Sequence, residues 1–164
     1  MSYTYMVTSS VNVDGAVDME SKAAAVGGVI CGDQGEWLFG FCHSLGSCSV
    51  VNVELWAILE EFRHAWRMKF NRVDVETDCR DIVISVTGNV ISSFGNTLIS
   101  KIHGVLRKDW EVVICHISRG ANVVADLLAR HLLGQSPREE LHFCALMWCQ
   151  ALLTTDLQNV VGVG

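Results

Sequence analysis

Residues 72–81 read RVDVETDCRD, and this stretch decides how the rest of the chain is interpreted. Apolar or β-branched residues alternate with acids, which predicts a strand with Val73, Val75 and Thr77 on one face. At Asp78 the alternation stops and helical spacing begins, so this acid is predicted to stand on a strand-to-helix turn. A carboxylate there is either a helix N-cap or a functional ligand, and the local pattern alone favours the cap.

The composition favours one compact domain. The 164 residues are 50% hydrophobic and 18% charged, proportions that allow a single buried core and argue against a disordered or coiled-coil protein. No uninterrupted apolar run approaches the length of a membrane span, and the N-terminal residues lack the pattern of a secretion signal. We therefore expect an intracellular monomer, nuclear or cytoplasmic, with no membrane partner.

The charge balance argues against tight, non-specific binding to nucleic acid. The chain has twelve Lys and Arg residues and eighteen Asp and Glu residues, which give a formal net charge of −6. Proteins that bind a phosphate backbone tightly usually carry a continuous basic surface. Local basic clusters at 63–72 and 101–108 leave two interpretations open, a nucleic-acid contact or solvated helix faces.

The cysteines do not indicate a disulfide framework. There are seven of them, scattered and without a C-x-x-C pair, so most are expected to be reduced core residues. His142, Cys144 and Cys149 lie close together, but the apolar background there favours packing over a metal site.

Hydrophobic periodicity predicts an α/β fold. Three antiparallel strands are followed by two strands parallel to the first, which gives a mixed five-stranded sheet with helices on both faces. The last of these strands is a near-continuous apolar run and is predicted to be buried on both faces. The predicted strands are 7–17, 26–31, 37–42, 72–78 and 111–117, and the predicted helices are 51–68, 79–87, 97–108 and 122–134.

The chain is predicted to form a domain over residues 1–134, followed by a C-terminal helical extension over 135–164. Residues 139–153 are strongly apolar and are predicted to be helical. We expect this helix to pack on the same domain, with a partner-binding surface as the alternative.

Three further acids occupy positions in or beside apolar segments, where a charged side chain is not expected from burial alone. Asp14 lies in an apolar strand, Glu54 in the first turns of the longest helix, and Asp126 one turn inside the last helix. Singly, each has a local explanation at a turn, at a positive helix end or on an exposed helix face. Short right-handed connections place Asp78 beside the Asp14 strand, and four converging carboxylates are the oxygen ligands that Mg²⁺ prefers for phosphodiester hydrolysis.

These acids occur in four short segments: VNVDGA at 11–16, VELWAIL at 53–59, VETDCR at 75–80 and ANVVADLLA at 121–129. In order and spacing the segments resemble the signature blocks of type 1 ribonuclease H. The likeness is strongest to plant ribonuclease H-like domains related to the C-terminal part of retroelement reverse transcriptases. It covers residues 11–131, which is most of the chain.

The resemblance implies an endonuclease that hydrolyses the RNA strand of RNA/DNA hybrids by a two-metal mechanism. It assigns Mg²⁺, or Mn²⁺, to Asp14, Glu54, Asp78 and Asp126. It also matches His116 to the family's mobile histidine, which assists proton transfer or product release. Because His116 ends a predicted strand, a packed or partly exposed strand residue is an equal alternative.

The resemblance further implies substrate contacts at Gly15, Ala16, Asn52, Cys79, Arg80 and Asn122. Three departures predict weaker affinity for a hybrid. Val50 and Val51 stand where other members carry paired asparagines, and Cys79 and Arg80 replace a polar pair after the strand acid. The segment 88–108 leaves no room for a basic helical protrusion. Two alternatives therefore stand beside the nuclease: a catalytically weak or inactive nucleic-acid-binding domain derived from a retroelement, or a protein-interaction module.

Overall fold

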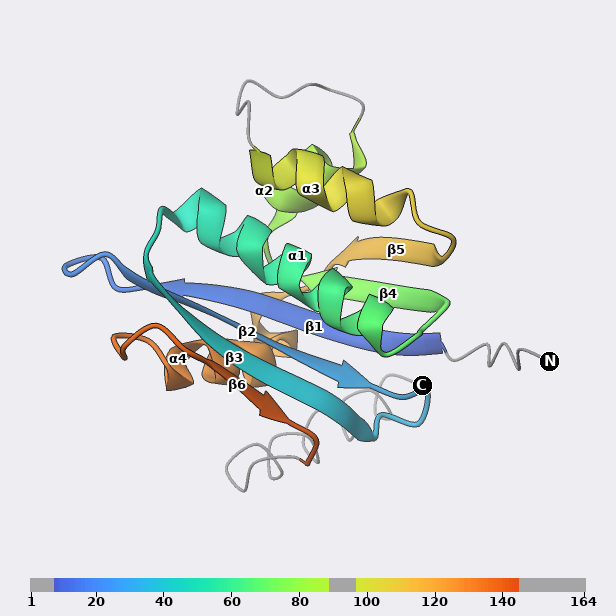
Figure 1. Ribbon diagram of the computed structural model, residues 1–164, viewed down its shortest axis with the longest axis horizontal. Coiled ribbons are helices and arrows are strands. Elements are labelled where there is room, and N and C mark those ends of the chain that lie inside the picture. The colour runs from blue at the N-terminus through green and yellow to red at the C-terminus, as the bar shows by residue number, and fades with distance from the viewer. Residues whose placement is uncertain (1–7, 89–96, 145–164) are drawn as a thin grey trace.

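A six-stranded mixed sheet forms the centre of the protein (Figure 1). The computed structural model describes residues 8–88 and 97–144. The strands run in the order β5-β4-β1-β2-β3-β6, in which β1, β2, β3 and β6 pair antiparallel and β4 and β5 are parallel to β1. The strands are β1 Thr8–Val17, β2 Ala23–Cys31, β3 Trp37–Ser47, β4 Arg72–Thr77, β5 Glu111–His116 and β6 Glu139–His142.

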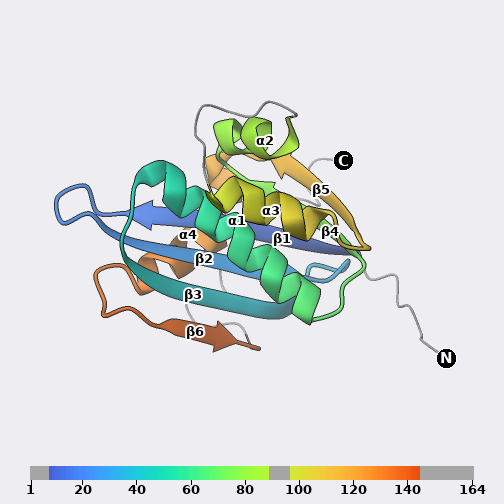
Figure 2. The same ribbon diagram turned by 45° about the horizontal axis from the view of Figure 1, so that its top comes forward.

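Helices cover both faces of the sheet, as predicted. On one face α1 packs on β1 and β2, and α3 lies beside α1 (Figure 2). On the other face α4 packs on β1, β2 and β3. None of the helices in the described ranges is long and apolar enough to cross a membrane. The helices are α1 Val50–Arg67, α2 Arg80–Thr87, α3 Thr97–Leu106 and α4 Val123–His131, and a short 3₁₀ helix, η1, spans Arg119–Ala121.

The main core lies between the sheet and α1. The alternation predicted from the sequence holds in β4, where Val73, Val75 and Thr77 are buried and the intervening acids are half-buried. The apolar face of α1, including Leu55 and Phe62, packs on β1 and β2 because residues three and four apart share one helix face. The first turn of α1 lies over the C-terminal part of β1, where a Cβ on Gly15 would come within 3.0 Å of Val53.

Parallel pairing of β1 with β4 sets the position of the predicted site. Asn12 pairs with Glu76 in the register of the two strands. Two residues further along each strand are Asp14 and Asp78, so the register carries the two acids to neighbouring positions.

The far edge of the sheet differs from the prediction. The helix expected from residue 139 is wrong over Glu139–His142, because these residues form β6 and pair with Gly40–His43 of β3. The pairing satisfies backbone groups that β3 would otherwise expose as an open edge. Residues 145–164, which carry the rest of the predicted helical extension and its alternative as a partner surface, lie outside the described residues.

Two burial predictions are also corrected. β5 is not buried on both faces: it is the opposite edge strand, with Glu111, Val113 and Cys115 exposed, because α4 lies over β1 to β3. Of the six described cysteines, none forms a disulfide and only Cys42 is buried, whereas most were expected in the core.

Candidate active site

Four acids from four elements come together where β4 ends beside β1. Asp14 lies in β1, Glu54 in the second turn of α1, Asp78 directly after β4, and Asp126 in the first turn of α4. Their charges act on one another: Asp78 and Asp126 raise the pKa of Asp14, and Asp14 and Asp78 raise that of Glu54. The structure therefore places the four predicted acids in one electrostatic cluster.

Asp14 is the buried centre of this cluster. Burial is the main cause that raises its pKa from 3.8 to about 7, and repulsion from Asp78 and Asp126 and a side-chain hydrogen bond with Asp126 add to the rise. The backbone N–H of Gly15 donates to Asp14 Oδ1 at 2.9 Å and acts in the opposite direction. The carboxyl group is held in place, but in an environment that disfavours its ionised form.

Glu54 carries the second strongly raised pKa of the cluster. Burial, followed by repulsion from Asp14 and Asp78, raises the pKa of Glu54 from 4.5 to about 8. Its Oε2 atom is buried and has no hydrogen-bond partner. A buried, unpartnered carboxylate oxygen among other acids is a suitable ligand for a hard cation such as Mg²⁺.

The four carboxylates lie near one another, but their oxygen atoms are not gathered tightly enough to share one cation as they stand. In the part of the chain that the structure describes, two groups of side chains have ligand atoms all within 4.8 Å of one another, and neither contains these acids. Asp126 is turned toward Arg130, whose Nε lies 3.0 Å from both of its carboxylate oxygens. Shared coordination of a cation therefore requires the side chains to rotate toward it.

Asn122 ties the start of α4 to β1. It is 1% exposed, and its Nδ2 donates to the carbonyl oxygen of Val13 at 2.8 Å. Asn12 donates to Glu76 Oε2 at 3.0 Å and to Asn122 Oδ1 at 3.4 Å. Asn122 is the N-cap residue of α4 but makes no cap hydrogen bond, because its side chain instead joins α4 to the sheet. This join positions Asp126.

The predicted N-cap role of Asp78 is wrong. The N-cap of α2 is Cys79, which makes no side-chain cap hydrogen bond, and Asp78 lies one residue outside the helix. The side chain of Thr77 accepts a hydrogen bond from the Cys79 backbone N–H at 3.2 Å and stabilises the turn instead. No cap hydrogen bond of α2 therefore occupies the carboxylate of Asp78.

The model of the reverse transcriptase-like family matches residues 12–132, a range that contains all four acids. The chain belongs to this family. A protein of Arabidopsis thaliana named "Putative ribonuclease H protein" is 36% identical over 127 residues, which are 77% of this chain and 20% of that relative. The chain thus spans a fifth of the length of the curated relative that it matches.

Solved structures share the fold. Ribonuclease H1 of the archaeon Halobacterium salinarum superimposes with a TM-score of 0.68 at 20% identity, over 76% of this chain and 95% of that one. LC11 ribonuclease H1, solved in complex with an RNA/DNA hybrid, gives a TM-score of 0.68 at 21% identity, over 75% and 94% of the two chains. The predicted ribonuclease H-like fold is confirmed, with one strand more than expected.

Two positions of this reverse transcriptase-like domain add to the acid cluster. His116 is the last residue of β5 and is exposed. Arg119, in η1, lies close enough to Glu54 to lower its pKa, against the larger effect of burial. The sequence reasoning missed Arg119, although a cation in the connection that leads to α4 and Asp126 was a usable signal.

The predicted substrate positions differ in exposure. Gly15 lies where β1 passes α1, and a Cβ there would approach Val53 to 3.0 Å, so the position requires a small residue. Burial raises the pKa of the Cys79 thiol, and the charge of Glu54 adds to this, which places Cys79 beside the acids. The remaining positions include two buried residues, Ala16 and Asn122, a half-buried one, Asn52, and an exposed one, Arg80.

Proposed function

We propose that this domain is a divalent-metal-dependent endonuclease that cleaves the RNA strand of RNA/DNA hybrids. The observation that carries the proposal is the convergence of Asp14, Glu54, Asp78 and Asp126 with two strongly raised pKa values and an unpartnered buried oxygen. Such a cluster is costly in an isolated protein and favourable around a cation. The similarity of fold to a ribonuclease H1 that was solved with a hybrid supports the choice of substrate.

The four acids would hold Mg²⁺, with Mn²⁺ as the alternative. The bound metal supplies an activated water and stabilisation of the leaving oxygen. Arg130 holds the carboxylate of Asp126 until substrate and metal are bound. His116, exposed at the end of β5, would assist proton transfer or product release.

Substrate contact would fall to the accessible positions. Ala16 and Asn122 are buried, so their part is to shape the site rather than to touch the nucleic acid. Gly15, Asn52, Cys79 and Arg80 remain for contact with the hybrid. An RNA/DNA hybrid is recognised through its backbone shape and 2′-hydroxyl groups, and the amide of Asn52 and the guanidinium of Arg80 can bind such groups.

A labelled RNA/DNA hybrid tests the proposal directly. The purified chain is incubated with the hybrid and Mg²⁺ beside an Asp78→Asn variant, and Asp81→Asn serves as a matched control because Asp81 is an exposed acid on α2. We expect Asp78→Asn to lose activity by about 100-fold or more and Asp81→Asn to retain it. If the parent protein cleaves the hybrid no faster than Asp78→Asn does, the proposal is refuted.

A second candidate function is binding of nucleic acid without efficient cleavage. Val50 and Val51 are exposed at the start of α1, at 52% and 41%, where a polar contact to a hybrid was expected from the family. In the basic cluster at 101–108, Lys108 follows α3, and its Nζ lies over the ring of Trp66, 5.0 Å from the centroid. Salt-dependent binding of a hybrid without turnover would favour this candidate, and no binding at low salt would exclude it.

A further inference from the structure

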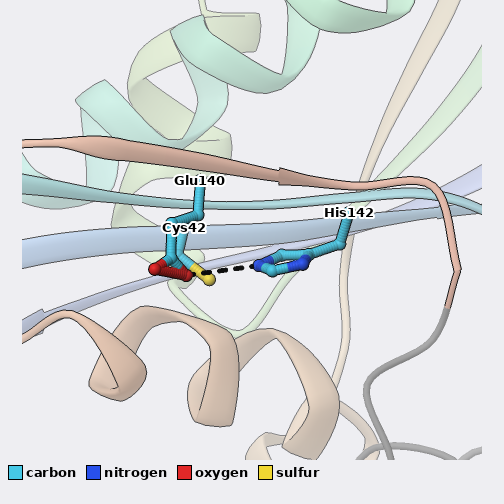
Figure 3. Close-up of side chains that lie close together, drawn as sticks. All are labelled: Cys42, Glu140 and His142. Carbon is cyan, nitrogen blue, oxygen red and sulfur yellow. Dashed lines mark ion pairs between the residues drawn. The ribbon is translucent and has the colours of Figure 1, made fainter.

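Three potential metal ligands meet on β3 and β6, away from the four acids. Cys42 lies directly opposite Glu140 across the antiparallel pair, and His142 lies two residues beyond Glu140 on the same face of the strand. The ligand atoms of all three lie within 4.8 Å of one another. Figure 3 shows the Cys42 thiol and the Glu140 carboxylate side by side, both directed toward the imidazole of His142.

We propose that Cys42, Glu140 and His142 form a second metal site, which takes Zn²⁺ or a similar divalent transition metal. The site joins β6 to β3 and is distinct in ligand chemistry from the oxygen-only cluster around Asp14.

The donor set selects the class of metal. Thiolate, imidazole and carboxylate groups are the ligands of Zn²⁺ in proteins, whereas Mg²⁺ prefers oxygen atoms alone. Metal–ligand bonds of about 2.0–2.3 Å in a tetrahedron place neighbouring ligand atoms about 3.3–3.7 Å apart. Glu140 Oε2 and His142 Nε2 are already 3.4 Å apart. Three protein ligands leave the fourth position for a water molecule.

His142 supplies an independent observation. Its Nε2 atom is buried and has no hydrogen-bond partner that meets normal geometry. The Nε1–H of Trp37 donates to the backbone carbonyl of His142 at 3.0 Å, which fixes this end of β6. A buried ring nitrogen aimed at a thiol and a carboxylate is costly unless a proton or a metal satisfies it.

Arg138 and His131 contact Glu140 from outside the cluster. Arg138 Nη2 lies 3.3 Å from Glu140 Oε1, and His131 Nε2 lies 3.2 Å from Oε2. Outer partners of this kind hold a ligating carboxylate in place. The side chains of His131 and Glu140 are 38% and 28% exposed, so an ion can reach the site from solvent.

Cobalt spectroscopy on the reduced full chain tests the site without any reference to nuclease activity. With excess Mg²⁺ present to occupy the oxygen-only cluster, Co²⁺ is added and thiolate-to-cobalt charge-transfer absorption is recorded. We expect one equivalent to bind with a tetrahedral spectrum, and Zn²⁺ to displace it. The band should disappear in Cys42→Ser and persist in Cys144→Ser, a control because Cys144 is an exposed thiol nearby.

A second variant guards against loss of folding in Cys42→Ser. His142→Gln removes a ligand from a strand at the edge of the sheet and should weaken Co²⁺ binding by at least about 10-fold while the circular dichroism spectrum is kept. The absence of a thiolate band in the parent, or a band of equal affinity in His142→Gln, overturns the proposal.

Discussion

Replacing Asp78 with asparagine is predicted to stabilise the metal-free domain while it abolishes cleavage. The substitution keeps the size of the side chain and removes one negative charge from the cluster. Asp78 raises the pKa of both Asp14 and Glu54, so its removal makes their ionisation less costly. Function and stability are thus expected to change in opposite directions at this residue.

The structure supplies the size of the effect. The pKa of Asp14 rises from 3.8 to about 7, and at about 1.4 kcal/mol for each pKa unit this is worth about 4 kcal/mol. Burial is the largest cause and repulsion from Asp78 is the next. Asp78 therefore accounts for a minor part of the total, and we expect Asp78→Asn to gain about 1–2 kcal/mol at alkaline pH.

The sign of the pH dependence follows from the raised pKa values. Asp14 and Glu54 bind protons more strongly in the folded than in the unfolded chain, so their contribution stabilises the protein at low pH. It is lost as the pH rises from the unfolded values of 3.8 and 4.5 through the folded values of about 7 and about 8. The gain from Asp78→Asn should appear across this window and vanish at its acidic end.

Urea unfolding in the presence of a chelator measures the effect at about pH 8 and about pH 5. Comparing variant with parent cancels the contributions of other buried acids, and Asp81→Asn controls for net charge. Adding Mg²⁺ should stabilise the parent more than Asp78→Asn. If the variant is no more stable than the parent at pH 8, or gains equally at pH 5, the inferred repulsion among the acids is refuted.

Three further substitutions probe the packing around the site. Asn122→Ala should lower the free energy of unfolding by about 1–3 kcal/mol, measured in urea, because it leaves the Val13 carbonyl without its partner. Glu61→Leu should raise it by about 1–3 kcal/mol, with no such gain in Glu61→Gln, because both Glu61 oxygens are buried and unpartnered. Gly27→Ala should cost about 3 kcal/mol, seen as a lower Tm, because its Cβ would lie 2.3 Å from the backbone nitrogen of Ala129.

The sequence was sufficient for the parts of the molecule in which pattern and packing agree. The alternation around Val73 and Val75 predicted β4, and the apolar stripe of α1 predicted the longest helix. The convergence of Asp14 and Asp78 followed from parallel pairing, which is confirmed by the register of β1 with β4. These features depend on local periodicity and on connections that allow few topologies.

The errors arose where a tertiary contact decided the outcome. Residues 139–142 are too few to show a strand period, and β3 fixes their conformation by pairing with them. Asn122, the N-cap residue of α4, likewise uses its side chain for a tertiary contact, because it donates to a carbonyl oxygen of β1 that is distant in sequence. Cys42 could not be linked to Glu140 and His142 without β6, so the second metal site was invisible in the sequence.

The position of Asp126 has a consequence for the order of events during synthesis. Asp14, Glu54 and Asp78 leave the ribosome first, whereas α4, which carries the fourth acid, follows β5. Because α4 must then dock on β1 through Asn122, the cluster of repelling acids is completed only when the last helix of the described chain closes on the sheet. A nascent chain that lacks α4 is spared part of that repulsion, so the main core can assemble before the four acids are brought together.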